Sequence, residues 1–216
     1  MKSIGEEISR FLASFDVALR ESEKEPSAIP DVEHFLALLA QSHIGELTSR
    51  PTGAGSKLPV CVHWRRAIEA AHGEPSCRMA AALDELGDHL NWVQSEHYVR
   101  SPPSANFVDN YGYAVIAGPP EIVPPLASAD KIATGLILFG PQTCYPLHRH
   151  PAIEIYYVVS GHAEWWRGDG PWQKKAPGSL IYHESWIPHG MRTSDEPLIA
   201  AYLWKGDLYT DARFVE

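Results

Sequence analysis

The hydrophobic residues of this chain repeat with two different periods, and the change from one to the other falls near its midpoint. In the first hundred residues apolar side chains recur three and four positions apart, as in Ile4, Ile8 and Phe11, which is the spacing of an amphipathic helix. In the second half they form short runs rich in β-branched and aromatic residues, separated by Gly, Pro or Asp, which is typical of strands. The two patterns predict an α+β fold with a helical N-terminal region over residues 1–105 and an antiparallel β-barrel or sandwich over residues 106–216.

Individual elements follow from the same periods. We expect helices at four places: residues 4–19, residues 32–39, a segment through Trp64 and Ile68, and residues 79–93. We expect strands in six runs: residues 111–118, 131–140, 152–161, 162–168, 178–183 and 197–204.

Composition excludes several classes of protein. The chain has 216 residues, of which 44% are hydrophobic, so it can bury a core and intrinsic disorder is a poor interpretation. Its 18 basic and 27 acidic residues give a formal charge of -9, which offers no general attraction for nucleic acid or for an anionic membrane surface. We therefore expect neither partner.

The cysteines and the N-terminal segment indicate the cellular compartment. The three cysteines, Cys61, Cys77 and Cys144, are widely spaced and support neither a disulfide framework nor a cysteine zinc site; Cys144 is expected to be a small buried thiol. Glu6 and Glu7 stand where a signal peptide would have its apolar run. These features predict a soluble cytoplasmic protein.

A constellation of histidines and one carboxylate carries the chemistry. On an extended strand residues two apart point the same way, so His148, His150 and Glu154 share one face. A later segment supplies His189 directly after a proline, with His183 as a competing candidate. Three imidazoles and one carboxylate suit a divalent ion such as Zn, Fe, Mn, Co or Ni, of which zinc or iron is favoured.

These residues resemble the two motifs of the cupin family over roughly residues 111–210. The spacing H-x-H-x3-E-x6-G is matched from His148 to Gly161, although the leading glycine stands two residues too far upstream. The second motif is looser, because Pro177 and Gly178 lack the intervening residue. The resemblance implies a metal-binding β-barrel of the cupin or jelly-roll type, and the context I-P-H-G favours His189 over His183 as the ligand.

Two tyrosines accompany the ligands. Tyr156 lies two residues after Glu154 and shares its face, and Tyr145 precedes His148 by three. A phenol has a pKa of about 10, but a nearby divalent cation lowers it and lets the tyrosinate act as a base. The alternative is that both tyrosines are packing residues with satisfied hydroxyls.

The positions of the tyrosines, of Trp204 and of the helical extension are similar to those in the cupin-type dimethylsulfoniopropionate lyases of marine bacteria. The resemblance implies cleavage of dimethylsulfoniopropionate into dimethyl sulfide and acrylate, with Tyr156 as the base, Tyr145 as a second active-site tyrosine and Trp204 in the substrate pocket. The ion would stabilise the charge that develops when the α-proton leaves. Tyr202, Trp204 and Trp186 are candidates to hold the sulfonium by cation–π attraction.

Other interpretations remain open on the same residues. A dioxygenase or a sugar isomerase would use the same ligands, and a non-enzymatic cupin would bind a small molecule while its helical half regulates or binds DNA. No Lys/Arg cluster in the helical half supports DNA binding. The helices could cover the barrel as a lid or form an interface, and we expect a homodimer that acts on a small sulfonium carboxylate.

Overall fold

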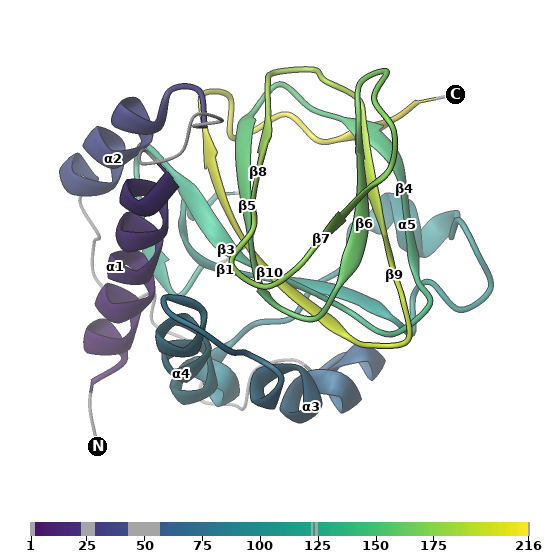
Figure 1. The fold of residues 1–216 in the computed structure, drawn as a ribbon, viewed down its shortest axis with the longest axis horizontal. Coiled ribbons are helices and arrows are strands. Elements are labelled where there is room, and N and C mark those ends of the chain that lie inside the picture. The colour runs from purple at the N-terminus through teal and green to yellow at the C-terminus, as the bar shows by residue number, and fades with distance from the viewer. Residues whose placement is uncertain (1–2, 23–28, 43–56, 122, 124, 216) are drawn as a thin grey trace.

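The structure, a computed structural model, describes residues 3–22, 29–42, 57–121, 123 and 125–215. Two β-sheets face one another. The earlier helices pack against the outer side of the larger sheet, whereas the short helix at Glu96–Arg100 lies beside the smaller sheet (Figure 1). The helices are α1 (Ile4–Ser22), α2 (Val32–Gln41), α3 (Trp64–Glu69), α4 (Ser76–Leu86) and α5 (Glu96–Arg100), with 3-10 turns at Pro59–His63 and Gly87–His89. None of these described helices combines the length and apolar character needed to cross a membrane.

The strands divide between the two sheets. The six-stranded sheet has the order β2-β1-β3-β10-β5-β8, and the five-stranded sheet has the order β11-β4-β9-β6-β7. The strands of the first are β2 (Ala127–Ser128), β1 (Tyr111–Gly118), β3 (Ala133–Phe139), β10 (Leu198–Lys205), β5 (Ile153–Ser160) and β8 (Leu180–His183). Those of the second are β11 (Arg213–Phe214), β4 (Cys144–Arg149), β9 (His189–Thr193), β6 (Ala163–Arg167) and β7 (Gln173–Lys175).

The predicted α+β class is confirmed, whereas the predicted closed barrel is not seen in the strand pairing. Within each sheet neighbouring strands are antiparallel, except that β1 and β2 are parallel. Among the described strands no hydrogen-bonded ladder joins one sheet to the other. The β half is therefore two facing sheets, the sandwich form of the expectation.

The central strands of the larger sheet are buried on both faces, which explains their uninterrupted hydrophobic runs. In β5, Ile155 and Tyr157 pack with the helices, while Tyr156 and Val158 pack between the sheets. Because side chains alternate along a strand, one run supplies two cores. The first core joins the helices to the sheet, and the second lines the interior that holds the histidines.

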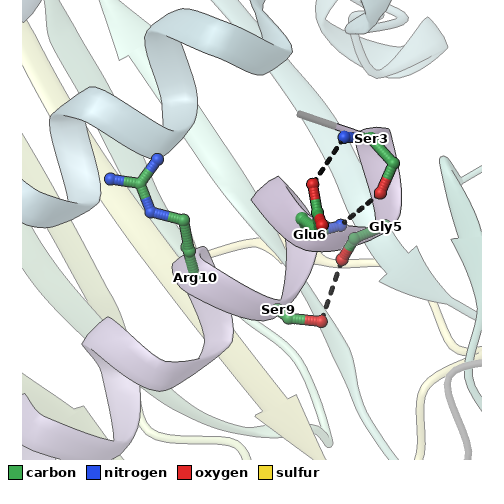
Figure 2. A pocket seen from close by; sticks show the side chains of 5 residues that line it. All are labelled: Ser3, Gly5, Glu6, Ser9 and Arg10. Carbon is green, nitrogen blue, oxygen red and sulfur yellow. Dashed lines mark hydrogen bonds between the residues drawn. The ribbon is translucent and has the colours of Figure 1, made fainter. Parts of the chain in front are cut away.

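The first helix begins with a reciprocal cap. The backbone N–H of Glu6 donates to Ser3 Oγ at 3.2 Å, and the backbone N–H of Ser3 donates to Glu6 Oε2 at 2.7 Å (Figure 2). This capping box satisfies donors that have no partner inside the helix. The same residues, with Gly5, Ser9 and Arg10, line a shallow hollow of about 570 Å³.

The fourth predicted helix is too long. The helix α4 ends at Leu86, a 3-10 turn follows from Gly87, and Val93 pairs instead with Tyr113 of β1 in an isolated bridge. The apolar residue Leu90 is buried without being helical. Leu90 follows Leu86 at a helical spacing because both side chains pack into the same core, although the chain between them is no longer α-helical.

The glycine of the first motif has a structural reason. Gly161 lies between β5 and β6 with a φ of 78°, a region that side chains disfavour. A Cβ at this position would lie 2.2 Å from the carbonyl oxygen of Pro197. Only glycine allows the chain to turn here against the start of β10.

Candidate metal centre

Four histidines and one glutamate gather in the interior between the two sheets. Their side chains are His148 on β4, His150 just after it, Glu154 on β5, His183 at the end of β8 and His189 at the start of β9, and each residue is at most 2% exposed. Strand register explains the meeting, because Glu154 pairs with His183 in one sheet and His148 pairs with His189 in the other. The four predicted ligands are thus brought together, and His183 joins them.

Backbone carbonyls orient three of the imidazoles. The Nδ1 atoms of His148, His150 and His189 each face a carbonyl oxygen, and a carbonyl only accepts. The acceptors are Pro146 at 2.8 Å, Ala152 at 3.0 Å and Ile187 at 2.9 Å. In each neutral ring the proton is therefore on Nδ1, and Nε2 keeps a lone pair, as in histidines that ligate metals through Nε2.

The carboxylate of Glu154 is surrounded by nitrogen atoms. Its Oε2 lies 3.3 Å from His150 Nε2, 3.2 Å from His183 Nδ1 and 3.4 Å from His189 Nε2. Its Oε1 accepts a hydrogen bond from Trp204 Nε1 at 2.5 Å. Burial would raise the pKa of Glu154, but the imidazoles gathered around its carboxylate outweigh burial and hold its pKa well below the usual range.

Burial favours the neutral form of three of the histidines, His148, His183 and His189. Burial lowers the pKa of His148 well below its ordinary value, and nearby His189 lowers it further. Burial and the neighbouring His183 lower the pKa of His189 to about 4, and burial lowers the pKa of His183 as well. Neutral imidazole is the form that binds a metal ion.

The arrangement fits a divalent cation. The donor atoms of His148, His150 and His189 lie within 4.8 Å of one another, and so do those of Glu154, His183 and His189. Nε2 of His189 is buried with no hydrogen-bond partner. A lone pair facing an ionised carboxylate is repulsive unless a proton or a cation lies between them, so these residues can hold a metal ion.

Tyr156 lies where its strand parity predicts. It is buried on the interior side of β5, pairs across the sheet with Tyr202, and lies near the carboxylate of Glu154. Burial and the charge of Glu154 raise its pKa well above the ordinary value. In the protein without a cation its hydroxyl keeps its proton.

Tyr145 contacts the centre and belongs to a cluster of aromatic residues. Its ring centroid lies 4.4 Å from that of His148 and 5.5 Å from those of Tyr98 and Tyr111. Tyr98 comes from α5 in the helical half. Sequence reasoning missed Tyr98 because no spacing relates this short helix to a strand almost fifty residues later.

The three predicted substrate-binding aromatics do not lie together. The ring of Trp204 lies 4.4 Å from that of His150 and 6.0 Å from that of Tyr202, so these two are interior neighbours of the centre. Trp186 is 41% exposed and its ring lies beneath the guanidinium of Arg213. Only its backbone N–H reaches the site, by donating to the carbonyl of His150.

The thiol of Cys144 was expected to be buried, and this prediction is wrong. Cys144 is exposed at the start of β4, because the parity that turns Tyr145 inward turns its neighbour outward.

A second hollow, of about 460 Å³ and lined by Glu21, Glu74 and Lys175 among others, lies between the helices and the β7–β8 turn, away from the histidines.

Comparisons with known proteins agree on one family. The model of the dimethylsulfoniopropionate (DMSP) lyase family matches residues 47–200. The DMSP lyase DddQ of Ruegeria pomeroyi is 36% identical over 52% of this chain and 54% of its own length. The protein DddL of Cereibacter sphaeroides is 32% identical over 68% of this chain and 60% of its own length, so each match spans little more than half of the curated relative.

Solved structures share the fold over nearly the whole chain. The crystal structure of DMSP lyase DddQ from Ruegeria pomeroyi has a TM-score of 0.74 and 24% identity, covering 97% of this chain and 96% of that one. A structure described with the DMSP lyases RdDddP and RnDddQII has a TM-score of 0.72 and 22% identity, covering 99% of this chain and all of that one. Because both structures have a sequence identity below 25% with this chain, these two comparisons show a shared fold and nothing more.

Proposed function

Because the chain belongs to the dimethylsulfoniopropionate lyase family, we propose that it is a metal-dependent carbon–sulfur lyase that cleaves dimethylsulfoniopropionate into dimethyl sulfide and acrylate. The observation that carries the proposal is the buried set of three histidines and Glu154 beside an inward tyrosine. Within this proposal the two facing sheets correspond to the flattened barrel of a cupin.

The ion would be held by His148, His150, Glu154 and His189. A mixed nitrogen and oxygen donor set suits a first-row divalent ion, with zinc or iron favoured. When bound, it would supply Lewis-acid stabilisation of the negative charge that develops on the substrate carboxylate.

Tyr156 would remove the proton from the carbon next to the carboxylate. As the ionised Tyr156 Oη takes the proton, the electron pair of the C–H bond forms the carbon–carbon double bond, and the C–S bond breaks with its pair going to sulfur. The sulfonium becomes neutral dimethyl sulfide, so its departure needs no acid. Neither oxygen nor a redox step is required, in contrast to a dioxygenase.

Aromatic side chains would hold the sulfonium. Trp204 and Tyr202 lie next to the centre on the interior face of β10. A cation over an aromatic face gains about 0.5–2 kcal/mol, more when water is excluded. Tyr145, fixed by its aromatic neighbours, would form another wall of the same site.

The test is anaerobic incubation of the metal-loaded protein with dimethylsulfoniopropionate, following acrylate and dimethyl sulfide. We expect both products in equal amounts, and a loss of about 10²–10⁴ in kcat for Tyr156→Phe at unchanged metal content. Tyr157→Phe is the matched control, because Tyr157 is the next residue on β5 and its hydroxyl bonds to Ser76 on the helix side.

Two outcomes would contradict the proposal. Absence of acrylate from a fully metallated protein would reject the lyase activity, and turnover that depends on oxygen would favour a dioxygenase. An equal loss in both tyrosine variants would reject Tyr156 as the base while leaving the reaction in place.

The homodimer, the cytoplasmic location and the division of the chain at residue 105 stay predictions. Sedimentation of the metal-loaded protein checks the homodimer. Expression of residues 106–216 alone checks the division of the chain. We expect this fragment to be unstable, because one hydrophobic cluster contains residues of α1, α4, β5 and β10 together.

A further inference from the structure

The sequence offers His183 only as an alternative to His189, and the structure brings both to the centre. It ends β8 and pairs in register with Glu154 on β5, so both side chains enter the interior from the same face of the larger sheet. Its side chain is 0% exposed. The ring is stacked on that of His189, with centroids 3.9 Å apart and planes at 19°.

The hydrogen bonding of His183 leaves one ring nitrogen without a partner. Its Nδ1 lies 3.2 Å from Glu154 Oε2, and an ionised carboxylate only accepts, so Nδ1 carries the proton. Nε2 then holds a lone pair, and this atom is buried with no hydrogen-bond partner. A buried acceptor without a donor is unfavourable unless a cation or an ordered water completes it.

The other histidines of the centre also keep one ring nitrogen for the interior, although His150 and His189 face Glu154 with Nε2 and His183 faces it with Nδ1. His148, His150 and His189 also bond an oxygen through Nδ1 and leave Nε2 free of any backbone partner. Glu154, His183 and His189 form a donor group within 4.8 Å, which shares His189 with the three-histidine group. The two groups are therefore parts of one cluster.

We infer that His183 is a fifth metal donor, so that this chain binds its divalent ion with four histidines and one glutamate. The inference rests on the metal centre of the proposed function and extends it beyond the four residues of the motif. A larger donor set would hold the ion when a substrate oxygen displaces one of the ligands.

The test uses the metal-free protein titrated with Co(II), whose visible absorption reports coordination. In His183→Gln the amide can still donate to Glu154, but it is a poor ligand. We expect a loss of affinity beyond the about 10–100-fold that changes outside the ligand set cost, together with an altered absorption band. His162→Gln is the matched control, because His162 lies 3.2 Å from Glu196 in an exposed pair of the same type.

The outcomes separate this inference from the proposed function. A wild-type absorption band in His183→Gln would overturn the fifth donor. If His148→Gln also binds Co(II) as the wild type does, the metal centre itself is rejected.

A measurement on the wild type covers the case in which His183→Gln fails to fold. In protein with ¹⁵N-labelled histidine, zinc should shift the imidazole nitrogens of four of the 11 histidines. Shifts confined to three histidines would overturn the inference.

Discussion

Trp204 shows how a single side chain outside the proposed ligand set can orient the candidate metal centre. Its indole N–H is the donor to Glu154 Oε1, and its ring packs against His150. It therefore fixes the orientation of a carboxylate and an imidazole at once, and outer hydrogen bonds of this kind hold ligands in their binding geometry.

We expect Trp204→Phe to weaken metal binding by about 10–100-fold, because phenylalanine keeps an aromatic ring but loses the donor. The measurement is a competition titration against a chromophoric chelator. Trp165→Phe is the control, since Trp165 is buried in the same interior and its Nε1 has no hydrogen-bond partner. Equal affinities of Trp204→Phe and the wild type would show that Glu154 does not need this donor.

At the scale of elements, a buried side-chain hydrogen bond connects the helical region to the back of β5. Ser76, at the start of α4, bonds to the hydroxyl of Tyr157 on β5 at 2.7 Å, and both residues are 1% exposed. This hydrogen bond thus anchors, on its helix-facing side, the strand that directs Glu154 and Tyr156 towards the interior.

We expect Ser76→Ala to lower the free energy of unfolding by about 1–3 kcal/mol, because it leaves a buried hydroxyl without a partner. The double variant Ser76→Ala with Tyr157→Phe should lose less than the sum of the two single variants, with a coupling of about 0.5–3 kcal/mol. Urea unfolding measures all three. Strict additivity would mean that the bond contributes nothing.

The strands show which elements a pattern can predict. The residues of β1 and β5 were predicted because long apolar runs are needed to fill two cores. The strands β7 and β11 were missed, since one is Gln-Lys-Lys and the other has two residues. Strand β11 forms because β4, which is distant in sequence, offers it hydrogen bonds, whereas β7 pairs at the sheet edge with the preceding strand β6.

At the scale of the whole molecule, the buried centre makes stability depend on pH. His148, His183 and His189 have pKa values below the ordinary 6.5 when folded. As the pH falls below 6.5, the unfolded chain binds protons that the folded chain excludes, so the free energy of unfolding decreases. The pKa of Glu154 is also lowered, so its stabilising contribution, present above 4.5, is lost below that pH.

We therefore expect the melting temperature of the metal-free protein to be level above pH 6.5 and to fall from there towards pH 4, where His189 itself takes up a proton. Thermal unfolding across this range checks it. His189→Gln should give a shallower decrease between pH 6.5 and 4.5. A level profile in the wild type would mean that the histidines are not held neutral.

The sequence alone determined the features that depend on neighbours along the chain. The shared inward orientation of Glu154 and Tyr156 follows from strand parity on β5, and the need for Gly161 follows from a turn. The single strand expected through His148, His150 and Glu154 is not observed, because β4 ends at Arg149 and β5, which belongs to the other sheet, begins at Ile153. These are local properties of the backbone, and they do not depend on which other segments the chain packs against.

Only the tertiary structure decided which distant segments meet. The pairing of Glu154 with His183, of His148 with His189, and the approach of Tyr98 to Tyr145 depend on strand register and on where α5 docks. Register is set by the burial of whole strands and by the loops between them. A histidine that follows no motif spacing therefore reaches the centre because its strand pairs with β5.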